Sequence, residues 1–221
     1  MSRNPFDPGP GDLPDSIPVF PLTGVLLLPR GRLPLNIFEP RYLNMVQDAL
    51  ATDRLIGMIQ PRDDGMAAEP PLFDIGCAGR ITSFSETDDG RFLITLTGVC
   101  RFRLLSEIPT TRGYRRAVAD WSGFSADLDE DGPSHIDRDR LDTALRTYFQ
   151  QQGITANWDS IAQAPLDRLI TSLAMICPFD APEKQALLES PDLEARARLL
   201  LALVEMAIHQ GGDGEGGSLR H

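Results

Sequence analysis

The chain has 221 residues, of which 42% are hydrophobic and 24% charged, and its formal net charge is −11. This composition is typical of a globular protein with one large domain or two small ones. The acidity argues against generic nucleic-acid binding and against binding to anionic membranes, because both need a positive field. No apolar run approaches the length that spans a bilayer, so we expect no membrane partner.

Residues 1–15 combine proline, glycine and aspartate and lack the apolar segment of a signal peptide, so we expect a disordered leader. The three cysteines, Cys77, Cys100 and Cys177, form no CxxC pair. An odd number of isolated cysteines indicates reduced thiols, and hence a cytoplasmic protein, rather than a disulfide framework.

Residues 16–122 carry mostly β signals. The stretch 17–42 reads IPVFPLTGVLLLPRGRLPLNIFEPRY, with prolines between short apolar runs. Proline fixes φ and removes a backbone donor, so this stretch predicts short strands joined by forced turns. Pro40 suits the first position of a helix over 40–51. Short strands, glycines and this inserted helix together predict a small, partly closed barrel.

An Asp-Gly step at 89–90 between two apolar runs predicts a β-hairpin. Its register is open between two closures, Thr87 with Gly90 or Asp88 with Arg91. Only the first closure places Cys77 opposite Cys100.

Residues 123–134 are acidic and predict a linker. The linker contains DLDEDG from Asp127, which opens like a calcium loop, but the twelfth position is Arg138 where a glutamate should close the coordination sphere. We therefore expect no metal site. Over 135–210 the apolar period becomes 3.6, which predicts a bundle of about four helices, and 211–221 is expected to be a flexible tail.

No catalytic constellation is visible. The only lysine, Lys184, lacks the glycine-rich loop of a phosphate-binding motif, and its polar neighbours predict a solvated, protonated side chain. The three histidines lie at the linker end, at a helix terminus and in the tail, and no GxSxG elbow is present. We expect no enzymatic activity and no cofactor.

The stretch 17–42 also begins a family resemblance. It is followed, in order, by Gly79–Phe84, Asp89–Gly90, Gly98–Arg103, Glu183–Glu189 and Leu193–Leu199. This ordered set resembles the N-terminal, substrate-binding domain of Lon proteases in its free-standing form. The resemblance implies an α+β fold, a PUA-like pseudo-barrel followed by a helical bundle. It also implies binding of unfolded or degron-bearing polypeptides, with a protease as the partner that would receive them.

A surface that grips diverse peptides combines an apolar groove with unpaired backbone at a sheet edge. The stretch 29–38 is our candidate for one wall of such a groove. The candidate peptide-binding residues are Arg30, Leu33, Leu35, Ile37, Phe38, Arg41 and Tyr42. The structural alternative is that Leu35 and Phe38 plug the barrel while Arg41 and Tyr42 tie the helix start to the sheet.

Arginines gather between residues 80 and 116, and Arg101 and Arg103 share one strand face. They are the candidate contacts of an alternative function, RNA binding. The other interpretation is a solvated strand face that resists aggregation, which the overall acidity favours. Nucleic acid is therefore not the expected partner.

Overall fold

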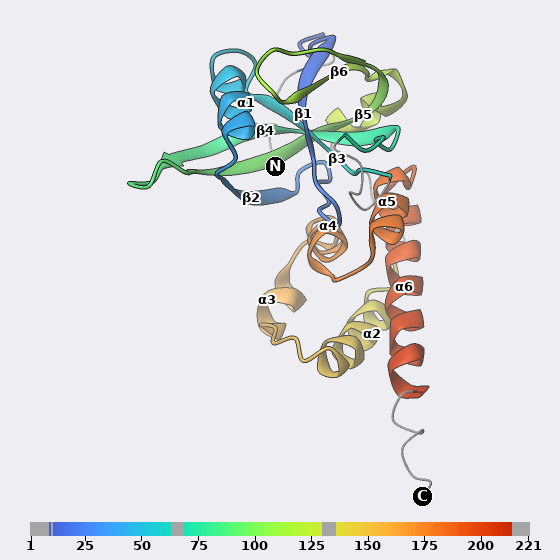
Figure 1. Cartoon of the computed structure of the whole chain (residues 1–221). Helices are drawn as coiled ribbons and strands as arrows, with labels where there is room; N and C mark the ends of the chain where they lie inside the picture. The colour runs from blue at the N-terminus through green and yellow to red at the C-terminus, as the bar shows by residue number, and fades with distance from the viewer. Residues whose placement is uncertain (1–8, 10, 63–68, 130–135, 214–221) are drawn as a thin grey trace, which may run out of the picture.

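A computed structural model of the chain describes residue 9 and residues 11–62, 69–129 and 136–213. Strands fill the first part and helices the second, which confirms the α+β prediction (Figure 1). The strands are β1 (Ser16–Pro21), β2 (Arg32–Ile37), β3 (Leu55–Ile59), β4 (Ile75–Glu86), β5 (Phe92–Ile108) and β6 (Arg115–Asp120). The helices are α1 (Pro40–Leu50), the 3-10 helix η1 (Ser122–Leu128), α2 (Arg138–Gln151), α3 (Trp158–Gln163), α4 (Leu166–Ile176), α5 (Ala181–Glu189) and α6 (Leu193–Asp213).

Five of the strands close into a ring, as predicted for a pseudo-barrel. The sheet order is β2-β5-β4-β3-β1-β6, and β5 also pairs with β6. Strand β1 runs parallel to β3, whereas the other pairings are antiparallel. Within the described residues, β2 stands outside the ring and pairs with β5 alone, so it is an edge strand. The far end of the β4–β5 hairpin projects beyond the barrel (Figure 1).

The hairpin closes in neither of the two expected registers. Gly90 N donates to Thr87 O at 2.9 Å, but Gly90 adopts φ +78° and Thr87 N donates to Arg91 O at 2.9 Å. Gly90 is therefore a bulge residue in a three-residue connection, which shifts the strands by one position. Further register shifts lie between Ile81 and Ser83 and between Ala78 and Gly79. Ile81 therefore pairs with Leu96, as the first closure would place it, whereas Cys77 ends up opposite Arg101 rather than Cys100.

A glycine lets the loop before β2 lie directly on β5. Arg30 N donates to Gly98 O, and Gly98 N donates to Gly31 O, both at 2.8 Å. A Cβ atom on Gly98 would lie 2.0 Å from the carbonyl oxygen of Leu28, closer than any side chain tolerates. This close approach needs the missing side chain of glycine.

The helices pack onto the barrel through a continuous hydrophobic core. One buried cluster joins barrel residues such as Leu27 and Met45 to helix residues such as Leu145 and Ile170. Most apolar residues of α2, α4 and α6 that recur with the 3.6 period are buried, and Asp180 and Glu183 form a capping box at the start of α5. No helix of the described ranges is long and apolar enough to cross a membrane.

Element boundaries differ from the sequence expectation at four places. Residues 11–15, expected in the leader, include Pro14, whose carbonyl accepts a hydrogen bond from Trp121 Nε1 at 3.0 Å. Helix η1 occupies the first half of the expected linker, α3 adds a fifth helix after the barrel, and α6 extends to Asp213 within the expected tail. Parts of all three expected segments lie outside the described residues: residues 1–8 and 10 of the leader, 130–134 of the linker and 214–221 of the tail.

Candidate functional site

The candidate peptide-binding residues of β2 split between core and surface. Ile37 is buried, and Leu33 and Leu35 are half-buried against the main core, so these three side chains face inward. Phe38 directly follows Ile37 and is 62% exposed. Phe38 therefore does not plug the barrel, and of the apolar candidates it is the one available to a ligand.

The two arginines among the candidates, Arg30 and Arg41, contact other parts of the chain. Arg30 adopts φ +63°, and its Nη2 donates to the carbonyl of Asp129 at the end of η1. Arg41 donates through Nε to Glu39 Oε2 at 3.0 Å, and its guanidinium carbon lies 4.5 Å from the Tyr42 ring centre.

Tyr42 itself is buried, with its ring 4.3 Å from that of Phe20. Burial raises the pKa of its phenol above the ordinary value. The contact of Tyr42 with Phe20 of β1 is what the structural alternative expects of a residue that ties the start of α1 to the sheet. The contacts of Arg41 stay within the start of α1.

A second exposed apolar residue lies at the same end of the sheet as Phe38. Leu93 of β5 is 46% exposed and sits opposite Asn36 of β2, on the face away from the core. We call Phe38 and Leu93 the sheet-end patch. Phe84 of β4, 42% exposed, is on the same hairpin and contacts Phe92 with ring centres 5.0 Å apart. Exposed apolar side chains thus gather where the hairpin projects.

The free edge of β2 is poorly suited to main-chain pairing with another strand. Pro34 lies in the middle of β2 and has no N–H to donate. Proline is tolerated in edge strands and protects them from pairing with other chains. Binding at this end of the sheet therefore depends on side chains more than on an added strand.

Arg101 is not the surface contact that the RNA alternative requires. Its guanidinium is buried and forms an ion pair with Asp127 of η1, with Nη2 2.8 Å from Oδ1 and Nε 2.8 Å from Oδ2. Arg101 Nη1 also donates to the carbonyls of Leu188 and Ser190, at 3.1 and 2.5 Å. Arg103 is exposed, whereas Arg101 is buried, so the expected pair does not present two guanidinium groups on one strand face.

Lys184 is buried rather than solvated, which corrects the sequence expectation. Its Nζ donates to Met175 O at 3.1 Å, and burial lowers its pKa below the ordinary value. The three cysteines are free and buried. Burial raises the pKa of Cys177 to about 12, and burial together with the Asp127 carboxylate raises that of Cys100 to about 12. None of these groups is placed or ionised as an accessible nucleophile.

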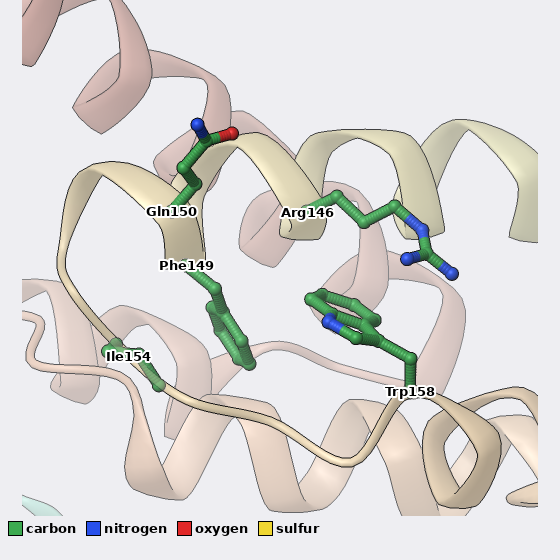
Figure 2. Close-up of a pocket in the computed structure, with 5 residues that line it drawn as sticks. All are labelled: Arg146, Phe149, Gln150, Ile154 and Trp158. Atoms are coloured by element: carbon green, nitrogen blue, oxygen red, sulfur yellow. The ribbon is translucent and has the colours of Figure 1, made fainter.

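A hollow among the helices was not foreseen from the sequence. Figure 2 shows its lining, with three side chains from α2, one from the following loop and one from the start of α3. These residues are Arg146, Phe149, Gln150, Ile154 and Trp158, and we call this site the α2–α3 hollow.

Its volume is about 360 Å³. The guanidinium carbon of Arg146 lies 4.4 Å from the Trp158 ring centre, and the Phe149 and Trp158 ring centres are 5.7 Å apart. The sequence signal for this site was a tryptophan directly after Asn157, whose side chain caps α3.

A family model described as the ATP-dependent protease La (LON) substrate-binding domain matches residues 16–206. Lon protease 2 of Sorangium cellulosum is 28% identical over 217 residues, which cover 92% of this chain and 26% of that protein. Lon protease 2 of Myxococcus xanthus is 26% identical over 204 residues, covering 87% of this chain and 24% of that protein. The chain spans about a quarter of the length of these curated relatives.

Two solved structures share the fold. The crystal structure of a Lon N-terminal domain protein from Xanthomonas campestris has 26% identity and a TM-score of 0.62, covering 85% of this chain and 97% of that one. The N-terminal domain of Mycobacterium avium complex Lon protease has 15% identity and a TM-score of 0.58, covering 86% of this chain and 98% of that one. The second similarity is one of fold alone.

Proposed function

We propose that this chain, which belongs to the family of ATP-dependent protease La (LON) substrate-binding domains, binds segments of unfolded polypeptide and catalyses no reaction itself. The family match carries this proposal, since it extends over both the barrel and the helices. The buried, carbonyl-bound Lys184 and the three buried cysteines support the absence of catalysis.

The sheet-end patch is the proposed contact for polypeptide. An unfolded segment exposes apolar side chains, and covering Phe38 and Leu93 removes their own apolar area from water. Each such contact contributes about 1–2 kcal/mol, because both side chains are already partly buried. Side-chain contacts of this kind tolerate many sequences, as binding of diverse unfolded segments requires.

The proposed role in the cell is that of an adaptor in protein quality control, which hands bound segments to a protease. Its support is that the curated relatives are named Lon proteases. Weak, exchangeable contacts suit such a role, because a tightly held segment would not be released. We do not propose RNA binding, because Arg101 is committed to Asp127.

A binding titration tests the proposal. Fluorescently labelled, carboxymethylated α-lactalbumin, which is permanently unfolded, is titrated with the protein and followed by anisotropy. We expect saturable binding that Phe38→Ser and Leu93→Ser each weaken about fivefold, the equivalent of about 1 kcal/mol. Leu105→Ser is the matched control, since Leu105 is 60% exposed on β5 beyond the hairpin. No binding by the unchanged protein would refute the proposed function.

A further inference from the structure

The α2–α3 hollow has the features of a second contact point for polypeptide, one that selects by charge. We propose that it receives an apolar side chain of a peptide, preferably aromatic, that has an aspartate or glutamate directly beside it. This inference rests on the proposed function and specifies which segments are held more tightly. It concerns the helices and not the sheet-end patch.

The apolar part of the ligand follows from the lining. The rings of Phe149 and Trp158 form one side of the hollow, and Ile154, which is 37% exposed, lies on the loop beside them (Figure 2). A volume of about 360 Å³ is near the lower end of the usual range for ligand sites, about 300–1,000 Å³. The hollow therefore accommodates one or two side chains of a passing peptide. An aromatic ring fits best because ring–ring contacts add to the burial of apolar area.

The acidic part of the ligand follows from Arg146. Its guanidinium lies over the indole of Trp158, and it is exposed and has no ion pair within the part of the chain that the structure describes. Contact with the ring face does not use the N–H groups of the guanidinium, which remain available to donate to a ligand. A carboxylate is the group that accepts two such hydrogen bonds side by side.

Neighbouring acidic groups do not neutralise this cation. Asp142, one helical turn before Arg146, has its Oδ2 atom 3.8 Å from Arg138 Nε and forms no ion pair with Arg146 among the described residues. Asp159 follows Trp158 in the first turn of α3 and is exposed to solvent. The net charge of −11 repels acidic peptides at long range, but charge interactions fade beyond about 8 Å at physiological ionic strength. Close to the indole, the attraction of a carboxylate to Arg146 therefore outweighs the repulsion from the net negative charge.

Three labelled peptides of equal length test this inference by anisotropy. The first has phenylalanine between two aspartates, the second has phenylalanine between two lysines, and the third has alanine between two aspartates. We expect the first to bind about tenfold more tightly than the second, since losing one hydrogen-bonded charge pair costs about that factor. We expect a similar advantage over the third, because the alanine peptide loses the apolar burial of the phenylalanine ring. Arg146→Ala should remove the preference for aspartate over lysine, and Ile154→Asp should weaken binding of the first peptide.

The matched control is Arg198→Ala, which removes one exposed arginine from α6 and should leave the preference unchanged. Circular dichroism of each variant checks that its helices are intact. Equal affinity for the first two peptides, or an unchanged preference in Arg146→Ala, would overturn the inference. If carboxymethylated α-lactalbumin still binds in a manner sensitive to Phe38→Ser, the proposed function stands without it. If the unchanged protein binds neither carboxymethylated α-lactalbumin nor the peptides, the proposed function and this inference are both refuted.

Discussion

Arg101 of β5 and Asp127 of η1 form a bidentate ion pair in which the two side chains are only 5% and 9% exposed. The same guanidinium donates to the carbonyl of Leu188 in the last turn of α5 and to those of Ser190 and Pro191 in the turn that follows. One side chain therefore connects the barrel, the short helix that follows it and the helical part. The carboxylate is the partner that offsets the cost of burying this cation.

Removing Asp127 should destabilise the protein strongly. In Asp127→Ala the buried guanidinium of Arg101 loses its only charged partner among the described residues, and such losses cost about 3–5 kcal/mol. Urea unfolding followed by circular dichroism measures the change in the free energy of unfolding. Asp129→Ala is the control, because it lies two residues away with an exposed side chain. Equal effects of the two substitutions would contradict the role assigned to the ion pair.

A methyl group on Gly98 should disturb the loop before β2. In Gly98→Ala the new Cβ meets the carbonyl of Leu28 at 2.0 Å, so the backbone must move, and we expect a loss of about 3 kcal/mol or more. Gly123→Ala is the matched control, since nothing lies within 4 Å of its added Cβ. Thermal unfolding compares the two proteins. A melting temperature of Gly98→Ala equal to that of the control would show that the loop does not press on β5 as described.

The buried thiols should make the protein less stable in alkali. Folding raises the pKa of Cys100 and of Cys177 to about 12, whereas the unfolded thiols ionise near pH 9. Above pH 9 the unfolded chain therefore releases protons that the folded chain retains, and stability falls as pH rises towards 12. Between pH 8 and pH 10 we expect a loss of about 1 kcal/mol for each of these two thiols.

Two measurements check this prediction. Urea unfolding at pH 8 and at pH 10 gives the loss directly, and Cys177→Ala should reduce it. An aromatic disulfide reagent at pH 8 should leave all three cysteines of the folded protein unmodified for minutes and react with all three in urea. Rapid modification of the folded protein would contradict the burial of the thiols.

Lys184 should be replaceable by a residue of similar length without charge. Lys184→Met retains the packing of the stem and removes the cost of burying an ammonium, at the loss of one hydrogen bond to Met175. We expect the free energy of unfolding to change by less than about 1 kcal/mol, and polypeptide binding to be unchanged. Urea unfolding and the lactalbumin titration measure both. A loss of binding in a folded Lys184→Met protein would assign this residue a function that its burial argues against.

Local sequence signals predicted the strands, the inserted helix and the helical stripes, because each depends on residues close in sequence. The capping box of Asp180 and Glu183 is such a signal, with partners three residues apart. The closure of the ring and the positions of the bulges were harder to predict from the sequence. Gly90 and the irregularities beside Ile81 and Ala78 each move the register by one residue, and an alternating pattern alone does not place a bulge.

Long-range pairing explains what the sequence could not predict about the candidate site. Arg101 and Asp127 are 26 residues apart, and each had a plausible local interpretation, the first as a surface arginine and the second as part of an acidic linker. Lys184 has polar neighbours in sequence but is covered by the packing of its helix. For Phe38, a residue directly after a strand, alternation no longer determines whether the side chain faces the core.

Site-specific photocrosslinking detects polypeptide bound at the sheet-end patch itself. A benzophenone amino acid replaces Phe38 in one variant and Leu105 in another, and each is irradiated with labelled, carboxymethylated α-lactalbumin. We expect strong crosslinking from position 38 and little from position 105, although both positions are similarly exposed. Equal crosslinking from the two positions, or none from position 38, would contradict it.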